Sequence, residues 1–205
     1  MKLYELAMLP NPRRVRIFLA EKGLLNDIEL VQVDVLKGEH RTAEFKAKNP
    51  TATVPVLELD NGQYISETVS ICRYFEALNP GGSLFGETAE EIARTDMWQR
   101  RIEGNLLGTL GTYFHQGTDG LGELELYQNK DWGLENFDRF KQGLDWLNSE
   151  LNTRNYAAGD QYSIADITLL CTLDFALFIQ AIEPKNYPAI ATWYERVSSR
   201  ESAKA

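Results

Sequence analysis

The sequence predicts an α/β domain followed by an all-helical domain. Short apolar runs typical of strands alternate with helical segments up to about residue 80. A linker signal follows at 79–83, where Asn-Pro-Gly-Gly-Ser interrupts the pattern. From residue 87 onward the apolar spacing is helical, with no strong strand. We therefore expect two domains, over residues 1–80 and 86–205.

The first domain is expected to begin with a strand at Lys2–Met8, which Leu9-Pro10-Asn11-Pro12 ends. Asn11 suits the N-cap of the following helix and Pro12 its first position, and Gly23 suits its end. The remaining expected elements are a strand at 28–35, a helix at 41–48, a strand at 56–60, a return strand at 63–65 and a helix opening at Ser66. This is the thioredoxin-like order, so the fold class is a thioredoxin-like N-terminal domain followed by an all-helical C-terminal domain.

The second domain is expected to contain helices near 88–116, 134–152, 163–182 and 187–200. Ser163-Ile164-Ala165-Asp166 has the form of a capping box at the start of the third helix. Apolar residues lie on more than one face of that helix, which predicts a central, buried position.

Composition excludes several classes of function. The formal charge is −9 and the sequence pI about 4.8, so a nucleic-acid partner is not expected. The N-terminus lacks a signal-peptide run, and no apolar stretch is long enough for a membrane span. Cys72 and Cys171 lie in apolar helical patterns, which indicates buried thiols in a reducing, cytoplasmic setting. Two histidines are too few and too scattered for a zinc site, so no metal is expected.

Pro55 occupies an unusual place at the start of a predicted strand. If the Val54–Pro55 bond is cis, the N–H and C=O of Val54 turn away from the sheet and offer an edge to an extended peptide. The alternative is a trans proline at the first position of the strand, which is the commoner arrangement.

Glu67 and Thr68 fall in the first turn of the following helix. Free N–H groups there attract a carboxylate, the Thr68 hydroxyl can add a hydrogen bond, and Glu67 can accept from an ammonium group. Together they suit the amino-acid end of a small peptide. The alternative is ordinary capping chemistry.

The stretch that carries these residues resembles a known family. Val-Pro-Val-Leu, a hairpin and then Ile-Ser-Glu-Thr-Val-Ser-Ile-Cys-Arg-Tyr-Phe-Glu is similar to the N-terminal domain of soluble glutathione S-transferases. The resemblance implies a cis Pro55, with Val54, Glu67 and Thr68 as ligands of glutathione, which acts as the co-substrate. A theta-like likeness implies that His40 meets the glycine carboxylate, although a lone loop histidine is usually just solvated. The family also implies a homodimer.

The usual catalytic position departs from the family pattern. Relatives place Tyr, Ser or Cys after the first strand, whereas residues 7–12 here carry neither a hydroxyl nor a thiol. Tyr4 lies within the strand and is expected to be core. The run Asn-Pro-Arg-Arg-Val-Arg-Ile-Phe-Leu-Ala-Glu-Lys-Gly resembles a fungal and bacterial theta-like branch that dispenses with this residue.

Groups at the start of the first helix are candidates for activating the thiol instead. A helix N-terminus stabilises a thiolate, and the amides of Arg13 and Arg14 are expected there. The amide of Asn11 could donate to the sulfur, in place of or beside an N-capping role.

Glycines at 104, 108 and 111 share one helix face with His115. Either this face borders the active site, with His115 assisting deprotonation of the thiol, or the glycines allow a neighbouring helix to pack closely and His115 caps the end.

The sequence therefore predicts a glutathione transferase that conjugates the glutathione thiolate to small hydrophobic electrophiles. The alternatives are a glutathione-binding interaction module with little turnover, and a glutathione-dependent peroxidase or disulfide reductase.

Overall fold

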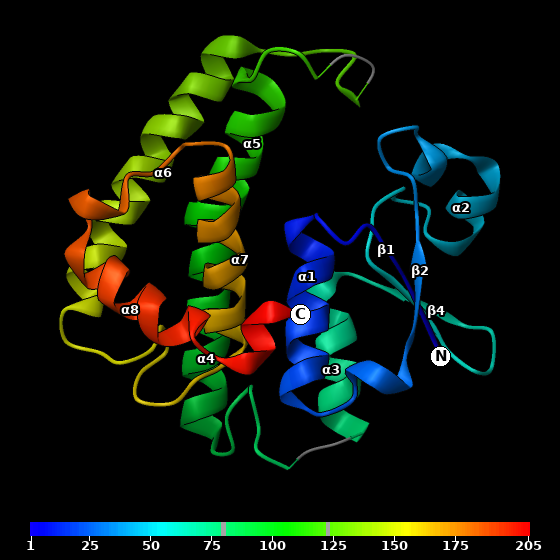
Figure 1. Ribbon diagram of the computed structural model, residues 1–205, viewed down its shortest axis with the longest axis horizontal. Coiled ribbons are helices and arrows are strands. Elements are labelled where there is room, and N and C mark those ends of the chain that lie inside the picture. The colour runs from blue at the N-terminus through cyan, green and yellow to red at the C-terminus, as the bar shows by residue number, and fades with distance from the viewer. Residues whose placement is uncertain (79–80, 122–123) are drawn as a thin grey trace. The chain divides into compact units, whose positions relative to one another are not determined.

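The computed structural model describes residues 1–78, 81–121 and 124–205 (Figure 1). The chain forms two compact units, one of Met1–Gly82 with Glu201–Ala205 and one of Ser83–Arg200. The last five residues thus group with the first unit, although the sequence placed them in the second domain. The reason is a set of contacts with the first long helix: Arg13 Nη2 donates to the Ala203 carbonyl at 2.8 Å, and the Ser202 hydroxyl donates to the Glu21 carboxylate.

The first unit contains a four-stranded mixed sheet with the order β2-β1-β3-β4. β1 pairs with β2 in parallel, and the β1–β3 and β3–β4 pairs are antiparallel. This arrangement confirms the thioredoxin-like prediction for the N-terminal domain. The elements are β1 (Lys2–Glu5), α1 (Pro10–Glu21), η1 (Leu25–Asp27), β2 (Glu29–Gln32), η2 (Glu39–Arg41), α2 (Ala43–Lys48), β3 (Val56–Glu58), β4 (Tyr64–Ser66), α3 (Thr68–Leu78) and η6 (Glu201–Lys204).

Successive side chains of β1 and β3 point to opposite faces of the sheet, and both faces are apolar. Leu3 pairs with Leu57, and both are fully buried. On the other face, Phe45 of α2 packs with Val56, and its ring meets Tyr4 edge-on at 6.5 Å between centroids. Figure 1 shows α1 and α3 on one side of the sheet and α2 on the other. Helices therefore cover both faces, as the burial pattern requires.

A buried ion pair holds the loop between β1 and α1. Arg16 donates to the carboxylate of Glu5 and, at 2.7 Å, to the Ala7 carbonyl. Gln32 on β2 joins the same network, donating to Glu5 Oε1 at 2.9 Å and accepting from the Ala7 N–H at 3.1 Å. The network ends the strand at Glu5, three residues earlier than predicted, and fixes the approach to α1.

The second unit is helical, as predicted. Its elements are α4 (Ala89–Ile102), η3 (Glu103–Leu107), α5 (Gly108–Gly117), α6 (Lys130–Leu151), α7 (Ile164–Phe178), η5 (Pro184–Asn186) and α8 (Pro188–Ser198). The helix expected over 88–116 is interrupted, because η3 is a π-helical segment between α4 and α5. Gly108 permits this turn, since a Cβ there would lie 2.9 Å from the Glu103 carbonyl oxygen.

Helix α7 is the buried centre of the second unit, as its apolar pattern predicted. Its capping box at Ser163 is present, and Asp166 does more than cap the helix. The fully buried Asp166 carboxylate accepts from the Ala157 N–H at 2.7 Å, the Ser163 N–H and hydroxyl at 3.0 Å, and the Trp193 indole at 2.9 Å. One side chain thus ties the loop before α7 to α8.

Glycines of α6 bring it into close contact with η3 and α5, but they are not the glycines that the sequence singled out. A Cβ at Gly143 would lie 2.8 Å from the Asn105 carbonyl oxygen, and one at Gly133 would lie 2.4 Å from the Gly117 nitrogen. At Gly104 and Gly111 a Cβ would meet nothing within 4 Å. Of the two alternatives for this face, close packing of a neighbouring helix is therefore wrong for the part of the chain that the structure describes.

This difference between the glycines predicts opposite effects of the same substitution. Gly143→Ala is expected to lower the free energy of unfolding by about 1–3 kcal/mol, because the methyl group overpacks against backbone. Gly111→Ala is its matched control and is expected to raise it by about 0.5–1 kcal/mol through helix propensity. Chemical denaturation of the two variants measures both values, and a shift of the same sign in both would contradict the packing described.

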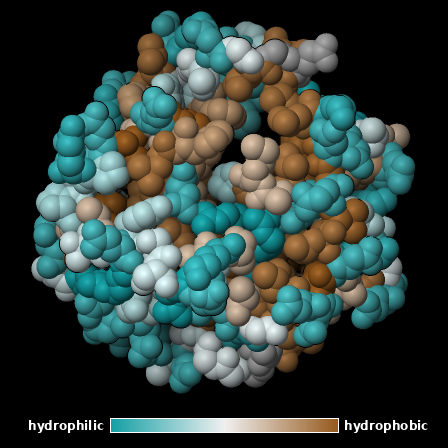
Figure 2. All heavy atoms as spheres, viewed as in Figure 1, coloured by the Kyte–Doolittle hydropathy of each residue, from teal (hydrophilic) through white to brown (hydrophobic). Residues whose placement is uncertain are grey.

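Hydrophobic and hydrophilic residues are interspersed on the face drawn in Figure 2. No helix within the described residues is both long and apolar enough to cross a membrane.

Candidate functional site

Glu67 immediately precedes α3 in a left-handed conformation, with φ 69°. Its carbonyl accepts the Ile71 N–H at 3.0 Å, so Glu67 occupies the N-cap position of the helix. A non-glycine residue in this conformation costs on the order of 1–3 kcal/mol and persists where its surroundings dictate it. The Glu67 side chain is exposed, and its carboxylate bonds to no group in the described parts of the chain. The N-terminus of α3 thus carries an open acidic group beside free helix N–H groups.

The Val54–Pro55 peptide bond is cis, which confirms what the resemblance implied. Val54 lies outside β3, and within the described residues neither its N–H nor its C=O takes part in a backbone hydrogen bond. The preceding segment is fixed by Asn49, whose amide donates to the Thr53 carbonyl at 2.9 Å and to its hydroxyl at 3.1 Å. Val54 therefore presents a backbone edge from a segment that is held in place.

His40 lies in η2 and is only 8% exposed, so the alternative of a solvated loop histidine is wrong. Its Nδ1 atom is buried without a hydrogen-bond partner among the described residues. Burial and the neighbouring Arg41 charge lower the pKa of His40 below its ordinary value of 6.5, so the ring is neutral at pH 7. A buried polar atom without a partner is costly, and a ligand group that bonds to it would remove that cost.

Thr68 connects the start of α3 with the start of α1. The Thr68 side chain is buried, and its hydroxyl donates to the Asn11 carbonyl at 3.5 Å. The first unit thus holds Asn11, His40, Val54, Glu67 and Thr68, whereas His115 belongs to the second.

The start of α1 differs from the prediction. The helix begins at Pro10 with Leu9 as its N-cap, and no side chain caps it, so the N-cap role expected for Asn11 is wrong. Pro10 takes the first helical position because its φ is already helical. Asn11 lies in the first turn instead, and its Oδ1 accepts from Arg14 Nη1 at 3.1 Å.

Few backbone donors are free at this helix start. Pro10 and Pro12 have no N–H, and the Arg13 N–H bonds to the Leu9 carbonyl at 3.2 Å, so the expectation of an open Arg13 amide is wrong. Arg14 lies far enough into the helix to bond within it. The Asn11 N–H remains unbonded among the described residues, as do the side-chain Nδ2 hydrogens of Asn11.

Tyr4 is not a thiol-activating group. Its hydroxyl donates to Glu58 Oε2 at 2.5 Å within the sheet. Burial and Glu58 raise the pKa of Tyr4 above its ordinary value, which disfavours the phenolate. This agrees with the structural role predicted for Tyr4.

His115 lies near the end of α5, and its ring is about half exposed. Its Nδ1 atom lies 2.7 Å from Oε1 of Glu125, in the loop that follows α5. The sequence reading missed Glu125, because the two residues are ten positions apart and no periodicity links a helix end to a loop.

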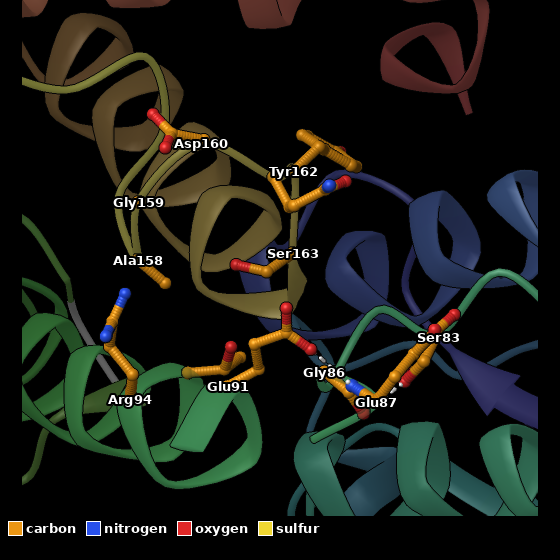
Figure 3. A pocket seen from close by; sticks show the side chains of 12 residues that line it. Ser83, Gly86, Glu87, Glu91, Arg94, Ala158, Gly159, Asp160, Tyr162 and Ser163 are labelled. Atoms are coloured by element: carbon orange, nitrogen blue, oxygen red, sulfur yellow. Dashed lines mark hydrogen bonds between the residues drawn. The ribbon is translucent and has the colours of Figure 1, made fainter. Parts of the chain in front are cut away.

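A pocket of about 330 Å³ lies within the second unit (Figure 3). One of its acidic residues, Glu91, has a structural role, since its carboxylate accepts from the Glu87 and Thr88 N–H groups at 3.0 Å and completes the capping box of α4. None of the candidate residues lines it. The lining residues are Ser83, Gly86, Glu87, Glu91, Arg94, Thr95, Ala158, Gly159, Asp160, Gln161, Tyr162 and Ser163. Across the described chain, no group of three or more His, Cys, Asp or Glu side chains could hold a metal ion.

Comparison with known proteins places this architecture in a family. Residues 10–78 match the model of the glutathione S-transferase N-terminal domain, and residues 108–201 match that of the C-terminal domain. Glutathione S-transferase 2 of Saccharomyces cerevisiae is 43% identical over 205 residues, which span all of this chain and 88% of the relative.

Solved structures agree with the sequence matches. The crystal structure of Gtt2 from Saccharomyces cerevisiae has a TM-score of 0.96 at 43% identity, over 100% of this chain and 99% of that one. A glutathione S-transferase domain-containing protein from Marinobacter aquaeolei VT8 has a TM-score of 0.95 at 42% identity, over 98% and 99% of the two chains. Both domains and the full length are matched, and the chain belongs to the glutathione S-transferase family.

Proposed function

We propose that the chain conjugates the thiolate of glutathione to small hydrophobic electrophiles, as a member of the theta-like branch that lacks the usual Tyr, Ser or Cys. The observation that carries the proposal is a set of unsatisfied groups in one unit. These are the buried Nδ1 of His40, the open backbone of Val54 beside the cis proline, and the unpaired carboxylate of Glu67. A peptide with an ammonium group at one end and a carboxylate at the other complements all three.

Each end of glutathione would meet a group of matching chemistry. Val54 would pair with the cysteinyl backbone of the tripeptide in antiparallel fashion. Glu67 would accept from the γ-glutamyl ammonium, while the Thr68 hydroxyl and the α3 N–H groups bind the adjacent carboxylate. His40 would bind the glycine carboxylate through an N–H of its neutral ring.

The start of α1 would stabilise the sulfur anion. The free N–H of Asn11 and its Nδ2 hydrogens are donors at a helix N-terminus, where a thiolate is favoured. Arg14 holds the side-chain oxygen of Asn11, which leaves the amide nitrogen available to donate. Met8, 65% exposed just before this helix, offers apolar contact to the electrophile.

Removal of the Asn11 side chain tests this assignment. Asn11→Ala is expected to lower kcat/KM for conjugation by about 10-fold, because one donor to the developing thiolate is lost while the backbone donor remains. The Kd for glutathione should change little. Asn152→Ala, an exposed asparagine at the end of α6, is the matched control and should leave both values unchanged. Full activity in Asn11→Ala would contradict the role.

His115 completes the proposed mechanism. As the proposed base, it takes up the proton of the glutathione S–H, and the electron pair stays on sulfur. The thiolate then attacks the electrophilic carbon, and the leaving group departs with its bonding pair.

A conjugation assay with glutathione and an aromatic halide tests the function as a whole. Turnover above the uncatalysed rate supports it. Tight glutathione binding without turnover would instead favour the interaction module, and turnover of a hydroperoxide alone would favour a peroxidase.

A cytoplasmic homodimer is part of the same proposal. Family membership supports the dimer, and the buried thiols of Cys72 and Cys171, which form no disulfide, suit a reducing compartment. Sedimentation equilibrium distinguishes a dimer of the 23.3 kDa chain from the monomer.

A further inference from the structure

We infer that Glu125 is the positioning residue for His115: its carboxylate fixes the proton of the neutral ring on Nδ1 and leaves Nε2 free to accept the thiol proton. The inference rests on the proposed function for the role of His115, but the pairing itself is a separate property of the second unit. Nδ1 of His115 and Oε1 of Glu125 are 2.7 Å apart, a short, charge-assisted distance.

The two ring nitrogens have different surroundings. Nδ1 faces the carboxylate, whereas Nε2 bonds to nothing within the residues that the structure describes. A carboxylate only accepts hydrogen bonds, so Nδ1 must carry the hydrogen, and in the neutral ring Nε2 then holds the lone pair. This division of roles is the one that a general base requires.

Burial also differs between the partners. The His115 side chain is 54% exposed and that of Glu125 only 23%, so the carboxylate is the more shielded partner of the pair. When Nε2 takes up the thiol proton, the resulting imidazolium lies against an anion that is partly shielded from water.

The loop around Glu125 is anchored to the end of α5. Gln128 Nε2 donates to the carbonyls of His115 and Thr118, each at 2.8 Å. The Asn129 N–H donates to the Gln116 side-chain oxygen, also at 2.8 Å. These bonds hold the returning chain against the helix end, so Glu125 approaches His115 from an anchored segment rather than from an unrestrained surface loop.

The proposed proton transfers balance without a further reagent. The S–H bond breaks, the proton goes to Nε2, and the thiolate forms the S–C bond to the electrophile. The imidazolium then returns its proton to the leaving group or to water. Glu125 gains no proton at any step.

Nitrogen NMR of the full-length protein tests the positioning directly. The chain has two histidines, so the spectrum of His115→Gln assigns the remaining signals. We expect the neutral ring of wild-type His115 to carry its hydrogen on Nδ1. Glu125→Ala should move the ring toward the other tautomer, and Glu125→Asp, which keeps a carboxylate, should restore the Nδ1–H form. Asp119→Asn removes the partner of Lys130 in the same loop and should leave the tautomer unchanged.

Thiolate formation by bound glutathione, followed by its ultraviolet absorbance, links the pairing to chemistry. Glu125→Ala is expected to lower the acid dissociation constant of the bound thiol by about 10-fold, and Glu125→Asp to recover part of it. An unchanged tautomer in Glu125→Ala would overturn the inference. The inference would also be overturned if the acid dissociation constant of the bound thiol were unchanged in Glu125→Ala but lowered in His115→Gln. That result would leave the proposed function intact. If His115→Gln itself leaves the thiol unchanged, the proposed role of His115 fails, and with it the catalytic part of this inference.

Discussion

Replacing Glu67 with glutamine is expected to raise the Kd for glutathione by about 10- to 100-fold. The carboxylate bonds to no other group among the described residues, and a hydrogen bond to a charged partner contributes about 1.5–3 kcal/mol. Isothermal titration calorimetry measures the change. Glu90→Gln, which changes an exposed acid in the first turn of α4, is the control and should bind glutathione as the wild type does.

The backbone conformation of Glu67 allows a second variant to separate the effect on binding from the effect on stability. Its left-handed conformation is unfavourable for glutamate and costs nothing for glycine. Glu67→Gly should therefore lose affinity as the glutamine variant does, yet be at least as stable as the wild type toward denaturant. A variant that loses stability and affinity together would show that Glu67 is a structural cap.

Asp166→Ala is expected to lower the free energy of unfolding by about 3–5 kcal/mol. Four donors converge on this buried carboxylate, and each one left without a partner costs about 1–3 kcal/mol, partly relieved by local rearrangement. Burial raises the pKa of Asp166 to about 6, so the carboxylate is ionised at pH 7 and its loss removes an anion from donors arranged around it.

Denaturant unfolding at pH 7 measures this loss. Asp138→Ala, on the exposed face of α6, removes a surface partner of Lys141 and should change stability by no more than about 0.5 kcal/mol. A loss of under about 1 kcal/mol in Asp166→Ala would contradict the account of α7.

Local signals in the sequence predicted most of the fold. The predicted strand and return strand are joined by a tight turn with Gly62 at φ 80°, and the Ser163 capping box opens α7. These features depend on neighbours within a few residues, so the sequence alone contains both partners. The break at η3 was not predicted, because a π-turn leaves the apolar stripe nearly unchanged.

Long-range contacts account for what the sequence did not predict. The buried partner of Arg16, Glu5, is eleven residues away in the sequence, and Gln32 lies 27 residues from Glu5, so no local pattern links the three. A motif indicated the ligand role of Glu67, whereas its left-handed backbone conformation follows from the junction of β4 and α3. Glu125 approaches His115 only after the loop beyond α5 folds back.

The claim on which this account depends is that Glu67 binds the amino group of glutathione. Calorimetric titration of wild type and Glu67→Gln, each with glutathione and with an analogue lacking the γ-glutamyl amino group, isolates that single contact as a thermodynamic cycle. The account predicts that removing the amino group weakens wild-type binding by about 10- to 100-fold and scarcely affects the variant. Equal losses in both proteins would contradict it.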